Sequence, residues 1–173
     1  LTIVRANARA DAVESLLATT ADADARGSLL RVLGRIGDES GLPLIRKALS
    51  AGDSSLIDAA VRAICDWPTA AARDDALAIA RTAPDPVHKV LALQAFIRML
   101  ELEPYRNPAA TTADLASALA LASRPEEKKL VLGLLPRFAC PEARALAESL
   151  LADPAVKDEA ALAVGRIKER LGG

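Results

Sequence analysis

Histidine and cysteine, the side chains that most often carry acid–base, nucleophilic and metal chemistry, are scarce in this sequence. His88 is the only histidine, and the two cysteines, Cys65 and Cys140, are far apart. One histidine and two distant cysteines do not make a standard zinc site, so no metal is expected. His88 follows Asp85-Pro86 near a predicted helix start, where a solvated side chain is a simpler interpretation than a general base. Both cysteines are interpreted as small buried apolar residues, and no spacing pattern supports a disulfide.

Adjacent acidic residues occur at Asp74-Asp75 and at Glu126-Glu127. Neighbouring residues on a helix point in different directions, so neither pair suits a mechanism that needs two facing carboxylates. Each pair is interpreted as favourable charge near a helix start. The sequence also has no glycine-rich phosphate loop and no nucleophile elbow. These observations predict a protein that is not an enzyme and needs no cofactor.

Arginines are the side chains best suited to binding, because a guanidinium group grips a carboxylate through two parallel hydrogen bonds. Six of them lie on the second helices of successive predicted helix pairs: Arg31, Arg35, Arg62, Arg98, Arg137 and Arg166. A repeating fold would bring such positions into a row, able to hold an acidic partner. The alternative interpretation is a solvated face with ion pairs between repeats.

The only tryptophan, Trp67, is a further candidate binding residue. It lies in Asp66-Trp67-Pro68, at the end of the helix predicted at 54–66. A tryptophan in so aromatic-poor a chain could anchor a partner. The alternative is that the indole packs over the junction between two repeats.

The composition is typical of packed helices. Hydrophobic residues make up 51% of the chain but aromatic residues only 2%, so the apolar content is mainly small and aliphatic. Such residues favour helix-on-helix packing over a β-sandwich. With 22 basic and 23 acidic residues the net charge is −1, which gives no global attraction to nucleic acid or to an anionic membrane. The expected partner is therefore a protein or peptide, with an acidic one favoured by the arginines.

No apolar run approaches the roughly 18 residues that a membrane helix needs. The first residues contain no initiator Met and do not resemble a signal peptide. The chain is interpreted as a fragment, a processed product or a domain of a larger protein. A monomer in the cytoplasm is favoured, and neither membrane nor nucleic acid is an expected partner.

Apolar residues recur at intervals of three and four along nearly the whole chain, which is the period of an α-helix. No segment alternates with the period of two that a strand would show. The pattern predicts helices at 8–19, 23–36, 41–50, 54–66, 70–82, 86–102, 111–123, 125–138, 142–152 and 155–171. The short breaks between them indicate antiparallel neighbours.

Capping residues mark several helix starts. Asp85-Pro86 and Asp153-Pro154 each place a carboxylate before a proline, so that the carboxylate accepts hydrogen bonds from free backbone N–H groups and the proline needs none. Asp53 is interpreted in the same way. Ser123-Arg124-Pro125-Glu126 fits a capping box in which Ser123 is the cap and Glu126 reaches back to it.

The sequence resembles itself at a fixed interval. Leu33-Gly34-Arg35-Ile36 matches Val164-Gly165-Arg166-Ile167, and Asp22 matches Asp153 at the same separation. Four steps of about 33 residues span that separation, which is a typical length for a paired-helix repeat. Leu132-Gly133-Leu134-Leu135 is an intermediate copy.

These residues resemble the HEAT-repeat family, in particular the bacterial HEAT repeats also seen in phycobilisome-lyase-like proteins. An acidic turn, a Val-Lys pair at Val156-Lys157, two alanines and a Gly-x-Ile ending at Ile167 fit the family pattern. The middle copies depart from it: Asp58 lies near a position that is usually basic.

The resemblance implies an all-α, right-handed superhelical solenoid of about five helical hairpins. The expected domain is 1–173, with repeats at 8–36, 41–66, 70–102, 111–138 and 142–171. The second helix of each hairpin would line the concave surface, and the recurrent Gly34, Gly133 and Gly165 would allow close helix approach.

The favoured function is a non-catalytic scaffold that binds a protein through this concave surface. Similar helical-repeat proteins include chromophore lyases and DNA glycosylases, so a lyase-like or glycosylase-like module is an alternative. Asp66 and Trp67 would be its only candidate site residues, and the balanced charge argues against phosphate binding. A third interpretation is a structural tail of a larger enzyme.

Overall fold

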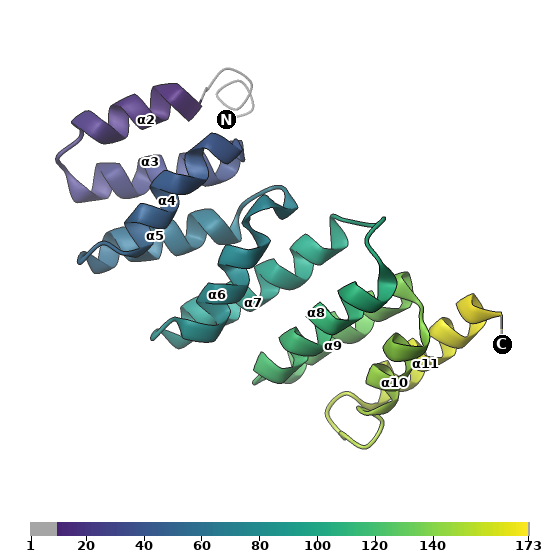
Figure 1. Cartoon of the computed structure of the whole chain (residues 1–173). Helices are drawn as coiled ribbons and strands as arrows, with labels where there is room; N and C mark the ends of the chain where they lie inside the picture. The colour runs from purple at the N-terminus through teal and green to yellow at the C-terminus, as the bar shows by residue number, and fades with distance from the viewer. Residues whose placement is uncertain (1–9, 173) are drawn as a thin grey trace. The chain divides into compact units, whose positions relative to one another are not determined.

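The computed structural model describes residues 10–172, which form helices joined by short loops (Figure 1). No residue in this range lies in a β-strand, so the predicted all-α class is confirmed. Within the same range, no helix has both the length and the apolar character needed to cross a membrane. The chain divides into two compact units, one ending at Ala95 and the other beginning at Phe96. Helix α7 (Pro86–Glu101) contains this boundary.

The first unit consists of successive helices that fold back on one another. Helix α3 packs on α2 and closely on α5, while α5 also contacts α4 and α6. The elements are α2 (Ala10–Thr19), α3 (Ala23–Ile36), η1 (Glu39–Gly41), α4 (Leu42–Leu49), α5 (Ser54–Cys65), η2 (Ala70–Ala72), α6 (Arg73–Thr82) and the first part of α7.

The second unit follows the same plan. Helix α11 packs on α10 and α9, α8 contacts α9 and α10, and the short η3 contacts all four of these helices. The elements are the end of α7, α8 (Pro108–Leu121), α9 (Pro125–Leu134), η3 (Leu135–Phe138), α10 (Pro141–Glu148) and α11 (Lys157–Leu171).

Most helix bounds agree with the bounds predicted from periodicity to within about three residues. The predicted helix at 70–82 begins with the 3-10 turn η2, and the one at 125–138 ends with η3. Helix α8 begins at Pro108, earlier than the predicted 111, and α10 ends at Glu148, short of the predicted 152. The predicted start at residue 8 lies outside the described residues.

The predicted aspartate caps are present at two of the three positions. Asp53 accepts hydrogen bonds from the N–H groups of Ser55 and Leu56, and Asp85 accepts one from the N–H of Val87 at 2.8 Å. Asp153 accepts from the N–H of Ala155, but α11 begins only at Lys157. Asp153 therefore caps the turn before the helix, and its predicted role as the helix cap is wrong.

The predicted capping box is displaced by one residue. Arg124 is the N-cap of α9, Pro125 is the first helical residue, and Glu127 is the one that reaches back. Its Oε2 accepts from the N–H of Ser123 at 2.9 Å and from that of Arg124 at 3.1 Å. The roles predicted for Ser123 and Glu126 are thus wrong.

The recurrent helical glycines have different surroundings. A Cβ atom at Gly34 would lie 2.5 Å from the carbonyl oxygen of Ala63, so α3 and α5 approach as closely as predicted. A Cβ atom at Gly133 or at Gly165 would meet nothing within 4 Å. The predicted close approach is confirmed at Gly34 and wrong at the other two positions.

Candidate functional site

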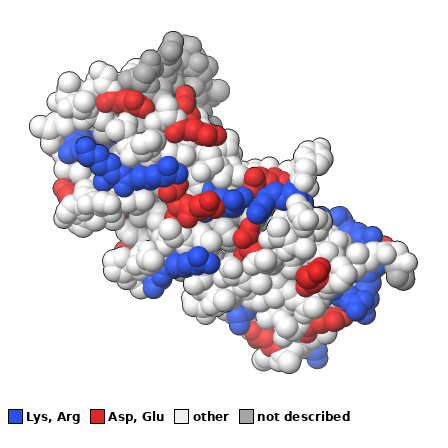
Figure 2. Space-filling model, viewed as in Figure 1, with Lys and Arg blue, Asp and Glu red and all other residues white. Residues whose placement is uncertain are grey.

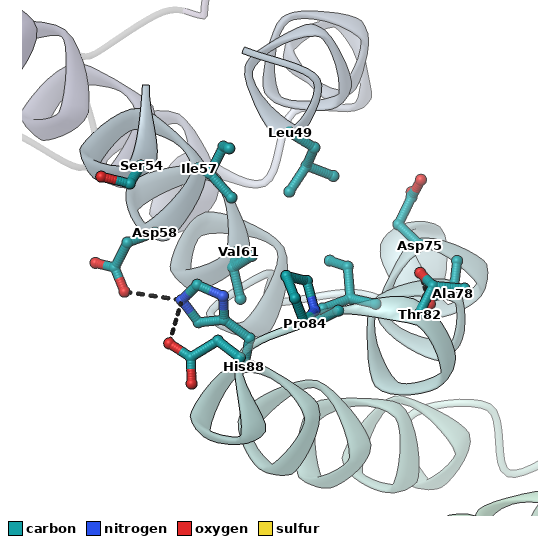
Figure 3. Close-up of a pocket in the computed structure, with 13 residues that line it drawn as sticks. Leu49, Ser54, Ile57, Asp58, Val61, Asp75, Ala78, Thr82, Pro84 and His88 are labelled. Carbon is teal, nitrogen blue, oxygen red and sulfur yellow. Dashed lines mark hydrogen bonds and ion pairs between the residues drawn. The ribbon is translucent and has the colours of Figure 1, made fainter. Parts of the chain in front are cut away.

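A pocket of about 530 Å³ opens in the first unit between α5, α6 and the start of α7 (Figure 3). We call it the His88 pocket. Its volume lies within the range of 300–1,000 Å³ that is usual for small-molecule sites. The lining residues are Leu49, Ser54, Ile57, Asp58, Val61, Asp75, Ala78, Ile79, Thr82, Ala83, Pro84, Asp85 and His88.

The repeat spacing brings together Asp58 and His88, the residues at the polar end of this pocket. Asp58 lies five residues after Asp53, the N-cap of α5, and His88 lies three residues after Asp85, the cap of α7. The two side chains are 30 residues apart in sequence, close to one repeat. They therefore meet where one second helix lies next to the following one.

His88 is buried, with 8% of its surface exposed, so its interpretation as a solvated helix-start residue is wrong. Its Nε2 lies 3.1 Å from Oδ1 of Asp58 and 3.9 Å from Oδ2 of Asp85. An ionised carboxylate can only accept, so His88 in its neutral form would carry its proton on Nε2. The other ring nitrogen, Nδ1, is then a hydrogen-bond acceptor. Figure 3 shows it on the side of the ring that faces Val61 and Pro84, inside the pocket.

Asp58 joins the pocket to one of the predicted binding arginines. The Arg62 Nε donates to Asp58 Oδ2 at 2.9 Å across one helical turn. This hydrogen bond, helped by that from His88, lowers the pKa of the Asp58 carboxyl, against the opposing effect of partial burial.

A matching contact occurs in the second unit with the charges reversed. Lys129 lies five residues after Arg124, the N-cap of α9, and Glu159 lies three residues after Val156, the N-cap of α11. Their side chains form an ion pair of 2.7 Å. The hydrogen bond raises the pKa of Lys129 and lowers that of Glu159. Contacts between acidic and basic side chains at this repeat position thus link consecutive second helices within each unit.

The lowered pKa of Asp58 predicts a pH-dependent contribution to stability. A folded-state pKa below the unfolded value of about 3.9 stabilises the fold above that pH, and the effect is lost as the pH falls through the folded-state pKa. Asp58→Asn should therefore lower the Tm at about pH 5, and its difference from the wild type should narrow towards about pH 2. Asp66→Asn, which removes a carboxylate that forms no ion pair with a described residue, is the control. An Asp58→Asn deficit that stays constant over this range would show that the carboxylate charge contributes nothing.

The walls of the pocket are mainly apolar. Leu49, Ile57, Val61 and Ile79 contribute aliphatic surface, and Asp75 lies at the end away from His88 (Figure 3). Asp75 accepts two hydrogen bonds of 2.8 Å from Arg46, one to each carboxylate oxygen. The geometry is that of a ligand site, with apolar surface and a few fixed polar groups.

The six predicted binding arginines fall into both units. In the first, Arg31 and Arg35 are exposed and form no ion pair with a described residue, whereas Arg62 pairs with Asp58. In the second, Arg137 pairs with Glu101 and Arg98 is half-buried. Arg166 is exposed, and no described residue forms an ion pair with it.

Basic and acidic side chains are interspersed on the face of the molecule that Figure 2 shows. Neither sign forms a broad continuous patch there.

Trp67 has no exposed surface, so its indole cannot anchor a partner. Its Nε1 donates to the Thr69 hydroxyl at 3.1 Å in the turn that follows α5. The packing interpretation is the one that fits. The glycosylase-like alternative used Trp67 as a candidate site residue, and a fully buried indole cannot contact a substrate.

The cysteines and acidic residues supply no metal site in the part of the chain that the structure describes. Cys65 and Cys140 do not form a disulfide with each other. Cys140 is buried at the start of α10, where its Sγ accepts from the N–H of Ala143 at 3.4 Å.

Sequence reasoning missed the pairing of Asp58 with His88. The available signal was their separation, because residues about one repeat apart on successive second helices become neighbours.

In comparisons with known proteins, no family model, no curated protein and no solved structure matches this chain.

Proposed function

We propose that this chain is a non-catalytic module that binds an acidic segment of a partner protein. The observation that carries the proposal is the pair Arg31 and Arg35, exposed on α3 and without an ionic partner among the described residues. Elsewhere in the first unit, Arg46 and Arg62 are held by aspartates. The guanidinium groups of Arg31 and Arg35 are thus available to a partner.

The helix geometry sets these two side chains on one surface. Residues four apart on a helix lie one above the other, so Arg31 and Arg35 project from the same face of α3. Arg62 occupies the position in α5 that Arg31 occupies in α3, nine residues after the N-cap. The close approach at Gly34 brings the two helices together. We call Arg31, Arg35 and Arg62 the arginine face.

Its chemistry favours carboxylates. An arginine can hold a carboxylate through two parallel hydrogen bonds, and two free arginines one turn apart suit a segment with several acidic side chains. Because Asp58 neutralises Arg62, Arg62 contributes contact surface and hydrogen-bond donors to the arginine face more than it contributes charge.

The absence of a nucleophile contact supports a non-catalytic role. His88 is the candidate base, but its Nε2 is bonded to Asp58, and no described serine, threonine or cysteine side chain shares a hydrogen bond with the ring. A nucleophile and its base are expected within hydrogen-bond reach of each other.

The wider architecture that we propose is a right-handed solenoid of stacked hairpins, as the HEAT resemblance implies. The packing of α3 on α5, and of α9 on α11, supports it. In such an array the second helices line the inner surface, and the arginine face would lie on it.

Charge reversal of the arginine face tests the proposal. Arg31→Glu/Arg35→Glu is expected to weaken the binding of a fluorescein-labelled oligoglutamate peptide by at least about tenfold, because two attractive contacts become repulsive. Fluorescence anisotropy at low and physiological salt measures the affinity, and far-UV circular dichroism checks that helicity is unchanged.

The matched control is Lys47→Glu/Arg81→Glu, which makes the same change in charge on α4 and α6. Both residues are exposed and without an ion pair to a described residue. If this control weakens binding as much as the α3 variant does, net charge and not the arginine face governs binding. The proposal then fails.

A further inference from the structure

We propose that the His88 pocket binds a small apolar molecule that carries a protonated amine. This inference concerns a different surface from the arginine face and does not depend on the acidic partner. It rests on the volume of the pocket, its apolar walls and the orientation of one buried ring nitrogen.

The walls select an apolar body. Leu49, Ile57, Val61 and Ile79 come from three helices and give aliphatic walls to a space of about 530 Å³. Burying aliphatic or aromatic atoms of a ligand against them contributes about 25 cal/mol per Å² of apolar surface removed from water. This burial of apolar surface contributes to affinity but does not discriminate between ligands with different head groups.

The ring nitrogen selects a hydrogen-bond donor. His88 is more than nine-tenths buried, and its Nε2 proton is directed to Asp58. Its Nδ1 faces the pocket as an acceptor, and no described residue donates to it (Figure 3). A ligand N–H or O–H would satisfy it, whereas a carboxylate would place two acceptors against each other.

The charges around the pocket select a cation among these donors. The lining holds three aspartates and no lysine or arginine. Arg62 and Arg46, which lie outside the lining, neutralise Asp58 and Asp75. Asp85 accepts from the N–H of Val87 through Oδ1, its Oδ2 lies 3.9 Å from Nε2 of His88, and no described lysine or arginine forms an ion pair with it. Asp85 is therefore the lining aspartate whose negative charge no described lysine or arginine neutralises.

Three probes with one tail separate these contributions. Hexylammonium, 1-hexanol and hexanoate share an apolar tail and differ in the charge and hydrogen-bonding capacity of the head group. Titration of the ¹⁵N-labelled protein, followed by NMR, should show saturable shifts of the His88, Val61 and Ile79 amides with hexylammonium. Hexanol should bind at least about tenfold more weakly, and hexanoate should cause no saturable shift.

Two variants and a control tie the binding to the pocket. Asp85→Asn keeps a capping side chain on α7 but removes the charge; it should weaken hexylammonium several-fold and leave hexanol unchanged. Ala78→Phe, at an exposed lining position, should abolish binding of both probes by filling the space. Asp74→Asn removes the same charge from the exposed residue beside Asp75 and should change nothing.

A lysine side chain carries the same head group, so N-acetyl-lysine methylamide is a necessary fourth probe. It should bind more weakly than hexylammonium, because its two amides would have to be desolvated. Tighter binding of this probe would assign the pocket to a lysine of a protein partner and overturn the small-molecule inference. Hexanoate binding as tight as that of hexylammonium, the lack of binding by any probe, or binding that survives Ala78→Phe would also overturn it.

Discussion

Gly34→Ala is expected to lower the free energy of unfolding of the first unit by about 2–3 kcal/mol. The added methyl group would lie 2.5 Å from the Ala63 carbonyl oxygen and 2.6 Å from its Cα. Both are backbone atoms, so the strain cannot be relieved by a change of rotamer, and α3 must move away from α5. The small gain in helix propensity from alanine, about 1 kcal/mol, does not offset this cost.

Gly165→Ala is the matched control, because this glycine occupies the corresponding position of the last repeat. A Cβ atom there meets nothing within 4 Å, so the substitution should stabilise α11 by about 0.5–1 kcal/mol. The only tryptophan, Trp67, is fully buried in the first unit. Its fluorescence during urea denaturation therefore reports the Gly34 variant, and circular dichroism reports both. Equal effects of the two substitutions would refute the assigned close approach.

Glu127→Ala is expected to destabilise the second unit by about 2 kcal/mol. Glu127 is only 1% exposed, and its carboxylate accepts from two backbone N–H groups and from Nε of Arg124. Removing this acceptor leaves donors at the start of α9 without a partner, which costs more than the net value of the hydrogen bonds. Thermal denaturation followed by circular dichroism measures the change.

Glu126→Ala is the control for this prediction. Its side chain is the exposed neighbour of Glu127 and is not the one that reaches back to the cap. Its replacement should alter the free energy of unfolding by no more than about 0.5 kcal/mol. Should Glu126→Ala prove the more damaging of the two, the capping box would have the register first expected from the sequence.

Local chemistry explains why the helices could be predicted from the sequence. A helix that buries one face has apolar residues at intervals of three and four. This pattern predicted each α-helix of the described range. The errors occur where two local signals compete. Pro125 prefers the first helical position, which makes Arg124 the cap and Glu127 the third residue, despite the better capping side chain of Ser123.

The early start of α8 has a similar origin. Asn107 precedes Pro108 and accepts hydrogen bonds from the N–H groups of Ala109 and Ala110. It is the same arrangement as Asp85 before Pro86. Pro108 lies in the break that the sequence predicts between the helices at 86–102 and 111–123, although a proline at a helix start is favourable.

Tertiary packing explains what the sequence did not reveal. His88 follows a helix cap, where solvation is the usual state, and its burial is produced by α5, about 30 residues earlier. Gly34, Gly133 and Gly165 share a repeat position, but only Gly34 has a neighbouring helix against it. A repeat pattern therefore predicts equivalent positions without predicting equivalent surroundings.

The central claim is that the exposed arginines of α3 and α5 receive an acidic segment of a partner. The most direct measurement is NMR mapping of the bound oligoglutamate peptide on the ¹⁵N-labelled protein. The account predicts saturable shifts that cluster on the exposed residues of α3 and α5 around Arg31, Arg35 and Arg62. Shifts that instead follow α4 and α6, or that scatter over all basic residues in proportion to their exposure, would contradict it.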